Sequence, residues 1–385
     1  MRLALDVSQG SLAKQGEEIC GDSLEIVRKN DEMMVVLSDG LGSGVKAGIL
    51  STMTVKMAAK LLSRGLPLEE TVETINKTLP ICKVRGLAYA TLNILYINEK
   101  NEVRFIQDDA PPLILIKHRS KQAIILEGQK NIIGGKEMSD YQFGIDEGDI
   151  LIIVSDGVPH AGVGAILELG WGMQGLMKYV QKQLPSLDEP EEWVEEILEV
   201  TRILYSEEPG DDATVVAIRA RKPRSLMLVS GPPKDQAKDE KLCKTFQSFE
   251  GRKVICGGAT ANMVAKKLQR NLETELEYSD PSVPPTAKME GVNLVTEGIL
   301  TINKAIERLK GVLGGENLKP KDDGATLLAK ELIQSEEIFL HIGTAINPAH
   351  KALAPAITYP DRIQAFGELV HLLERLGKKV EIQWY

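Results

Sequence analysis

Two segments of the sequence run an apolar, strand-like stretch directly into the tripeptide Ser-Asp-Gly, at Met33–Gly40 and Ile150–Gly157. A run of consecutive apolar residues is typical of a strand that is covered on both faces, so each aspartate lies where a buried strand emerges. The glycine that follows allows a sharp turn and leaves its carbonyl oxygen accessible. Two such strand ends side by side would bring two carboxylates together, which is costly unless a cation lies between them. The repeat therefore predicts buried strands whose ends bind a cation.

Two further acidic groups stand at the beginning of strand-like segments. Asp211 and Asp212 precede the segment 214–218, and Asp22 precedes the segment 24–27. No suitable histidine or cysteine accompanies them, so the predicted ligand set is all oxygen, which favours Mg²⁺ or Mn²⁺ over zinc or copper. A single Asp-Gly is usually only a turn. Two Ser-Asp-Gly strand ends together with Asp-Asp-Ala-Thr make that interpretation the weaker one.

Groups of strands and groups of helices follow one another in the first part of the chain. Strands are predicted at 24–27, 33–37, 91–97, 103–106, 113–117, 123–127, 150–154 and 214–218, and helices from about 44 and at 68–79, 164–184 and 191–205. Consecutive strands with helices inserted between the groups favour packed antiparallel sheets. We expect an α+β fold in this part, a two-sheet antiparallel sandwich flanked by helices.

The clearest domain boundary is the segment Arg219–Arg224, where four basic residues and a proline separate two apolar segments. We therefore expect one domain at 1–220 and another at 225–385. In the second, predicted strands at 226–229, 253–256, 274–278, 293–295, 338–342 and 380–384 largely alternate with helices near 236–249, 260–271, 298–310, 324–335 and 361–377. That alternation is typical of a three-layer α/β domain with a mostly parallel sheet.

Composition argues against several classes of protein. With 385 residues, of which 43% are apolar and 26% charged, the chain suits a globular protein of two domains. Its net charge of −9 argues against nucleic-acid binding, which needs a basic surface. The four cysteines form no CxxC pair, so neither a structural zinc site nor a disulfide framework is expected. Neither a signal peptide nor an apolar stretch of roughly 20 residues is recognised, which predicts a cytoplasmic protein without a membrane span.

Four motifs occur in order: Gly-Asp-Ser at 21–23, Ser-Asp-Gly-Leu-Gly-Ser-Gly at 38–44, Gly-Asp-Ile-Leu-Ile-Ile-Val-Ser-Asp-Gly-Val at 148–158 and Gly-Asp-Asp-Ala-Thr-Val at 210–215. Together they resemble the metal-dependent serine/threonine phosphatases of the PPM (type 2C) family. The resemblance is closer to the bacterial SpoIIE/RsbU/RsbX branch, and it extends over essentially the whole first domain. We identify no family for the second domain.

The resemblance implies a sandwich of two antiparallel sheets with a centre of two Mn²⁺ or Mg²⁺ ions at one end. Asp39 would bridge the two ions, Asp22 would hold metal-bound waters, and Asp212 would have a supporting role in catalysis where eukaryotic relatives commonly carry asparagine. Carried over position by position, the metal ligands would be Asp39, Gly40 through its carbonyl, Asp156 and Asp211.

This sequence also departs from the family pattern. Leu41 stands where eukaryotic members have the histidine of Asp-Gly-His, a favoured general acid. The loop that reads Gly-His-Pro-Pro in many bacterial members is Asp109–Pro112 here, and no phosphate-binding arginine is assigned in the N-terminal segment. His160 could assist proton transfer, although an ordinary loop histidine is the simpler interpretation. The departures concern protonation of the leaving group rather than metal binding.

The function implied by the resemblance is hydrolysis of phosphoserine or phosphothreonine on a partner protein, such as a STAS-type regulator. Water between the two ions would attack phosphorus in line, without a covalent enzyme intermediate. Two alternatives stay open: a ligand-sensing adaptor whose phosphatase domain is weak or inactive, and a hydrolase of small phosphate esters. The second domain would regulate the first, form a homodimer or bind a small molecule.

Three turns of the second domain, after Cys256, Val295 and Ile342, are rich in glycine and threonine. Turns of this kind at the carboxyl edge of an α/β sheet bind small ligands in many proteins, although tight turns alone would also explain them. Asp323 precedes a helical stretch and is interpreted as its N-cap.

Overall fold

The computed structural model describes residues 2–29, 32–79, 90–164, 166–274, 283–318, 323–345 and 359–385. The chain forms two compact units, unit 1 at Met1–Lys222 and unit 2 at Pro223–Tyr385. In the described part of the chain, no helix is both long enough and apolar enough to cross a membrane.

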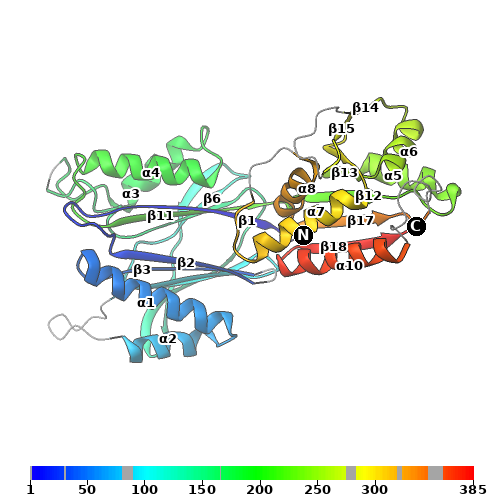
Figure 1. Cartoon of the computed structure of the whole chain (residues 1–385). Coiled ribbons are helices and arrows are strands. Elements are labelled where there is room, and N and C mark those ends of the chain that lie inside the picture. The colour runs from blue at the N-terminus through cyan, green and yellow to red at the C-terminus, as the bar shows by residue number, and fades with distance from the viewer. Residues whose placement is uncertain are drawn as a thin grey trace. The chain divides into compact units, whose positions relative to one another are not determined.

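Unit 1 contains two antiparallel sheets, as the sequence predicts (Figure 1). The five-stranded sheet has the order β1 (Ala4–Leu12), β11 (Ala213–Arg221), β10 (Ile150–Val154), β6 (Ile114–Lys117) and β7 (Gln122–Ile125). The six-stranded sheet has the order β2 (Asp22–Lys29), β3 (Glu32–Asp39), β4 (Leu92–Ile97), β5 (Glu102–Asp108), β9 (Lys136–Gly144) and β8 (Gln129–Ile133).

Strands β3 and β10 are buried over most of their length, because each is apolar on both faces. One face of each contributes to the core between the sheets, which includes Leu37, Phe105, Ile153 and Val216. The other face of the six-stranded sheet packs against α1 (Gly44–Ser63) and α2 (Leu68–Thr78), and that of the five-stranded sheet packs against α3 (Gly172–Gln183) and α4 (Pro190–Leu204). Figure 1 shows the resulting four layers of helix, sheet, sheet and helix. The predicted sandwich is confirmed.

Two details of unit 1 differ from the prediction. The helix predicted at 164–184 begins only at Gly172, because Gly170 and Gly172 adopt positive φ angles of 75° and 66° and the residues before them form turns. Strands β1, β8 and β9 were not predicted. Their apolar residues are too scattered to produce a strand pattern, and four of the five β8 residues are exposed.

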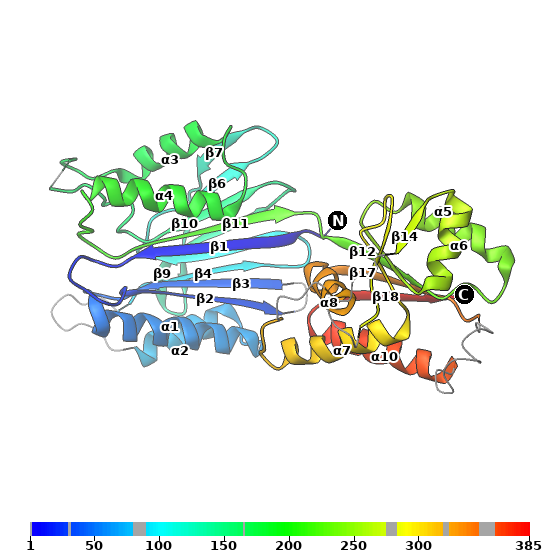
Figure 2. The same ribbon diagram turned by 45° about the horizontal axis from the view of Figure 1, so that its top comes forward.

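Unit 2 has one seven-stranded sheet between two layers of helices (Figure 2). Five strands are parallel, in the order β16 (Leu294–Thr296), β13 (Arg252–Cys256), β12 (Ser225–Ser230), β17 (Glu337–Ile342) and β18 (Lys379–Trp384). An antiparallel pair, β14 (Leu272–Thr274) and β15 (Ala287–Met289), extends the β16 edge. This confirms the predicted α/β architecture with a mostly parallel sheet.

The helices of unit 2 cover both faces of its sheet. The 3₁₀ helix η1 (Gln236–Lys238) leads into α5 (Asp239–Ser248), which lies with α6 (Gly258–Leu268) on one face. The other face carries α7 (Ile299–Leu313), α8 (Gly324–Gln334) and α10 (Tyr359–Arg375). Asp323 caps α8 by accepting bonds from the Ala325 and Thr326 N–H groups at 3.0 and 3.1 Å.

Candidate metal centre

Asp22 and Asp39 lie directly opposite each other in the β2–β3 pair, with Asp22 beginning one strand and Asp39 ending the other. Directly opposed residues of an antiparallel pair project from the same face, so the two carboxylates are neighbours. The end of β3 is fixed on its far side by Thr91, whose N–H donates to the Asp39 carbonyl at 2.8 Å and whose Oγ1 accepts from the Asp39 N–H at 2.9 Å. The backbone therefore holds this carboxylate pair in place.

Gly40 directly follows Asp39 and is packed against the first turns of α1. A Cβ atom at Gly40 would lie 2.2 Å from the Ala47 carbonyl oxygen, a distance that real Cβ atoms essentially never show. Only glycine therefore allows α1 to begin so close to the end of β3. This close approach gives the glycine of the first Ser-Asp-Gly motif a packing requirement as well as a turn.

The five-stranded sheet supplies the second group of carboxylates. β10 ends at Val154, two residues before Asp156, and β11 begins at Ala213, directly after Asp211 and Asp212. The two strands pair antiparallel, and the Ser155 N–H donates to the Thr214 carbonyl at 3.0 Å, so the end of one strand meets the beginning of the other. One ligand atom each from Asp156, His160 and Asp211 lies within 4.8 Å of the others.

Asp212 connects the two sheets through its contacts with the segment before β2. Its Oδ1 accepts a hydrogen bond from the Lys14 N–H at 3.0 Å, and its Oδ2 lies 2.7 Å from the Cβ position of Gly21. Because Gly21 immediately precedes Asp22, this contact brings the beginning of β2 next to the beginning of β11. The two groups of acidic strand ends therefore belong to one cluster.

The electrostatics of this cluster are unfavourable in the absence of a cation. Burial raises the pKa of Asp39 to about 9, and the nearby Asp22, Asp156 and Asp211 carboxylates add to the rise. Burial also raises the pKa of Asp22 to about 6, with a further contribution from Asp212 and Asp156. The pKa of Asp211 is raised by burial and by Asp156. Burial and neighbouring carboxylates thus raise the pKa values of Asp22, Asp39 and Asp211 and favour their protonated forms.

The hydrogen-bond pattern fits a bound divalent cation. Both carboxylate oxygens of Asp22 and the Oδ2 of Asp212 are buried without a hydrogen-bond partner. Buried carboxylate oxygens are normally paired or coordinated to a metal. Several oxygen donors with one exposed imidazole form a hard ligand set that suits Mg²⁺ or Mn²⁺. The cluster therefore has the ligands and the unbalanced charge expected of a metal centre.

The structure brings the sequence-predicted residues Asp22, Asp39, Gly40, Asp156, Asp211 and Asp212 to the same ends of the two sheets. Which of them binds metal stays a prediction. His160, interpreted from sequence as an ordinary loop histidine, lies with its Nδ1 3.8 Å from Asp156 Oδ2. Tyr205 was missed: its hydroxyl donates to the Gly157 carbonyl at 2.8 Å, and no sequence motif signals this contact from α4's C-terminal end.

Comparisons with known proteins point to one family. The family model "Stage II sporulation protein E (SpoIIE)" matches residues 29–221, half of the chain. The chain is 26% identical over 212 residues to the stage II sporulation protein E of Bacillus subtilis, covering 54% of this chain and 24% of that protein. It is 20% identical over 222 residues to the phosphoserine phosphatase RsbU of the same species, covering 57% of this chain and 64% of that one.

One similar solved structure is that of the PP2C phosphatase domain of Bacillus subtilis SpoIIE with a fragment of its regulatory domain. Its TM-score is 0.49 and its identity is 21%, and the match covers 57% of this chain and 63% of that one. The chain thus spans about a quarter of the length of the full SpoIIE relative and less than two thirds of RsbU. The family match lies in unit 1 and includes Asp39, Asp156 and Asp211. The chain belongs to the SpoIIE family.

Proposed function

We propose that unit 1 is a metal-dependent protein phosphatase that hydrolyses phosphoserine or phosphothreonine on a partner protein. The observation that carries this proposal is the convergence of acidic strand ends from two sheets, with Asp22 opposite Asp39 on one and Asp156 beside Asp211 on the other. Membership of the SpoIIE family and similarity to a phosphoserine phosphatase support the same activity.

We propose that the cluster holds two Mn²⁺ or Mg²⁺ ions. Asp39 would be the central metal ligand, since it is buried and the charges of Asp22, Asp156 and Asp211 all act on it. The remaining metal ligands would be the Gly40 carbonyl, Asp156 and Asp211. When bound, such ions lower the pKa of a coordinated water and neutralise charge on a phosphoryl group.

Residues around the centre would position water and supply a proton to the leaving oxygen. Asp22, buried with both oxygens unpaired, would orient water at the centre, and Asp212 would keep the 14–21 segment against β11 through its bond from the Lys14 N–H. His160 is exposed and lies beside Asp156, so it is a candidate to hold the proton that the leaving serine or threonine oxygen needs. The Tyr205 hydroxyl would hold the turn at Gly157.

A protein substrate is favoured over a small ester by the apolar surface near the cluster. Val45, Ile49 and Met53 are exposed at successive turns of α1, which begins four residues after Gly40. Exposed apolar rows of this kind are typical of protein contact surfaces. The row would serve a phosphorylated regulatory protein, of which a STAS-type regulator is one example, or a second copy of the chain in a homodimer.

We propose that residues 225–385 form a regulatory or small-molecule-binding domain of this phosphatase. The competing functions are a ligand-sensing adaptor with a weak or inactive phosphatase domain and a hydrolase of small phosphate esters. Retention of every acidic residue of the cluster favours an active enzyme over the adaptor, because an inactive site would be free to lose carboxylates.

Hydrolysis assays separate these functions. The full chain would be incubated with a phosphoserine protein and with p-nitrophenyl phosphate, with Mn²⁺ titrated in and with EDTA added. The proposal predicts Mn²⁺-dependent turnover that EDTA abolishes, with a higher kcat/KM for the phosphoprotein. Higher kcat/KM for the small ester would favour the small-ester hydrolase, and no turnover with Mn²⁺ bound would favour the adaptor. Asp39→Asn should abolish this turnover. Its matched control is Asp146→Asn, which removes an exposed carboxylate at the end of β10 that lies away from Asp156.

A further inference from the structure

The order of the parallel strands in unit 2 identifies one place on its sheet. From β12 the chain adds β13 and then β16 on one side, after which β17 and β18 are added on the other. The strand order therefore reverses at β12, between its neighbours β13 and β17. In doubly wound sheets, ligands bind outside the carboxyl ends of the strands at such a reversal. Here those ends are Ser230, Cys256 and Ile342.

Arg362 of α10 lies at this edge of the sheet. Its Nη1 donates to the Gly343 carbonyl at 2.9 Å, directly after β17, and lies 2.5 Å from the Cβ position of Gly231, directly after β12. Gly231 has a φ angle of 80°, so a residue with a side chain would be strained there and would collide with the guanidinium. The backbone is thus shaped to admit the guanidinium between the two strand ends.

Among the residues that the structure describes, none balances the charge of Arg362. No carboxylate in the described part of the chain pairs with this half-buried guanidinium, and burial lowers the pKa of the group. Arginine has five N–H donors, of which the bond to Gly343 uses one. A partly buried charge without an ion partner is costly, and a bound anion would offset that cost.

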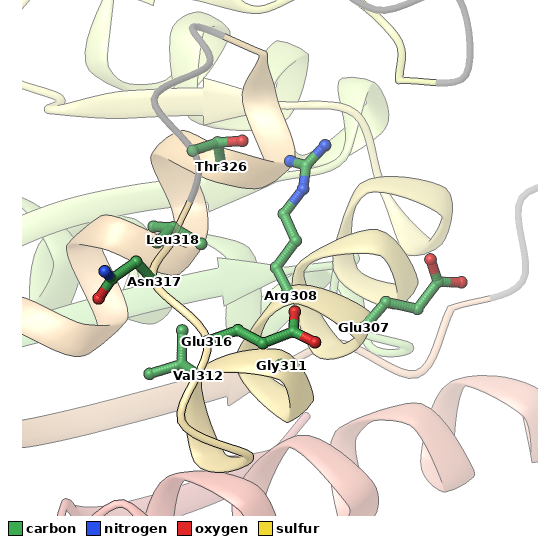
Figure 3. A pocket seen from close by; sticks show the side chains of 8 residues that line it. All are labelled: Glu307, Arg308, Gly311, Val312, Glu316, Asn317, Leu318 and Thr326. Carbon is green, nitrogen blue, oxygen red and sulfur yellow. The ribbon is translucent and has the colours of Figure 1, made fainter.

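A second arginine of unit 2 gives the contrast. A pocket of about 230 Å³ between α7 and α8 is lined by Arg308, Glu307, Glu316 and Thr326 among others. Figure 3 shows Arg308 extending from α7 towards the first turn of α8. There the buried Asp323 carboxylate forms an ion pair with it. The charge at Arg308 is therefore already neutralised, whereas no described carboxylate pairs with Arg362.

The turn after β12 restricts what such a ligand can be. It reads Gly231-Pro232-Pro233, and prolines have no N–H to donate. The Gly231 N–H is also occupied, since it donates to Thr260 Oγ1 at 2.8 Å. This turn cannot surround a pyrophosphate with backbone donors as a glycine-rich dinucleotide loop does. An anion at this edge would be held mainly by the Arg362 side chain.

We propose that unit 2 binds a small metabolite carrying a single oxyanion group, a carboxylate or a phosphate monoester, which pairs with Arg362 at the carboxyl ends of β12 and β17. Thr260, which accepts the bond from the Gly231 N–H, lies in the first turn of α6. The N–H groups at the beginning of that helix therefore face the same edge of the sheet. Glu297 lies near Gly258 and would repel an anion from the β16 end. The site therefore centres on β12 and β17. It deepens the proposed ligand-binding role of unit 2 and does not depend on phosphatase activity in unit 1.

Trp384 provides the signal for a binding test. It ends β18 opposite Ile342, and its ring lies 6.4 Å from that of Phe366, one helical turn after Arg362. Metal-free full-length protein in EDTA would be titrated separately with inorganic phosphate, AMP and acetate at constant ionic strength, with tryptophan fluorescence as the readout. Without metal, the acidic cluster of unit 1 repels these anions. A Trp384→Phe variant should lose the signal if it arises at this edge.

The matched variants are Arg362→Gln and Arg375→Gln, which remove the same charge from the two ends of α10, the second at an exposed position. We expect saturable binding of at least one probe by wild type and by Arg375→Gln. Affinity should be at least tenfold weaker in Arg362→Gln, and Arg362→Lys should be intermediate because it keeps the charge but not the planar fork. Thermal unfolding checks that each variant is folded. Equal affinity in wild type and Arg362→Gln, or no saturable binding of any probe, would overturn the proposal.

Discussion

Asp39→Asn should stabilise the metal-free fold while removing its ability to bind divalent ions. In the metal-free protein, burial and the surrounding carboxylates raise the pKa of Asp39 from an ordinary value of 3.8 to about 9. The unfolded chain therefore releases a proton above pH 3.8 that the folded chain keeps until about pH 9, and this difference favours unfolding. An asparagine carries no such charge at any pH.

The size of this effect follows from the pKa difference. A shift of one pKa unit corresponds to about 1.4 kcal/mol, so the full rise would be equivalent to roughly 4 kcal/mol at pH 7. Rotation of the carboxylates away from each other and access of water reduce that value, and we expect a gain of about 2 kcal/mol in the free energy of unfolding. The gain should be absent near pH 4 and should grow as the pH rises towards 9, because the wild-type fold is destabilised over that interval.

Urea unfolding in EDTA, followed by tryptophan fluorescence, measures this gain. Trp171 and Trp193 both lie in unit 1, and Trp193 is fully buried beneath the five-stranded sheet. Wild type should gain stability when Mn²⁺ replaces EDTA, whereas Asp39→Asn should gain little. Asp146→Asn should behave as wild type does in both conditions. A less stable Asp39→Asn in EDTA, or equal stabilisation of both proteins by Mn²⁺, would refute the reasoning.

Three further predictions concern the same structure. Mn²⁺ affinity should rise with pH between about 6 and 9, because the raised pKa values of Asp22 and Asp39 mean that both groups must release protons when Mn²⁺ binds. Calorimetry in two buffers of different ionisation enthalpy would detect that release. Gly40→Ala should weaken Mn²⁺ binding at least tenfold, since its Cβ would overlap a backbone carbonyl of α1; unchanged affinity by calorimetry would contradict this. Asp323→Ala should lower the free energy of unfolding of unit 2 by about 2–3 kcal/mol, because Asp323 caps α8 and pairs with Arg308. Phosphate-ester hydrolysis should not change. Urea unfolding followed by the fluorescence of Trp384 would test the loss of stability.

Much of the fold follows from the sequence because its most buried strands are its most apolar ones. β3, β10 and β11 are covered on both faces, and their continuous apolar runs predict their positions. The grouping of consecutive strands between helices predicts the two-sheet sandwich. β8 has four exposed residues, so its sequence carries little apolar signal and its pairing depends on β9. The helix predicted to begin at 164 begins only at Gly172. The positive φ angles of Gly170 and Gly172, which end the preceding turns, are not visible in the sequence pattern.

The acidic cluster is predictable from sequence only in part. The Ser-Asp-Gly motifs indicate that Asp39 and Asp156 end buried strands, but sequence alone does not determine which strand ends become neighbours. The opposition of Asp22 and Asp39 depends on strand register, and the approach of His160 to Asp156 depends on the turns after β10. The site in unit 2 depends on the order in which strands are placed in the sheet, which no local motif encodes.

An anomalous diffraction map of crystals grown with Mn²⁺ would show whether the acidic strand ends of the two sheets form one metal centre. We expect two peaks a few ångströms apart, one on each side of Asp39, with Asp156 and Asp211 next to one of them. Crystals of Asp39→Asn should lack both peaks. Mn²⁺ bound elsewhere in unit 1, with no peak among these three carboxylates in wild type, would exclude a metal centre at these strand ends.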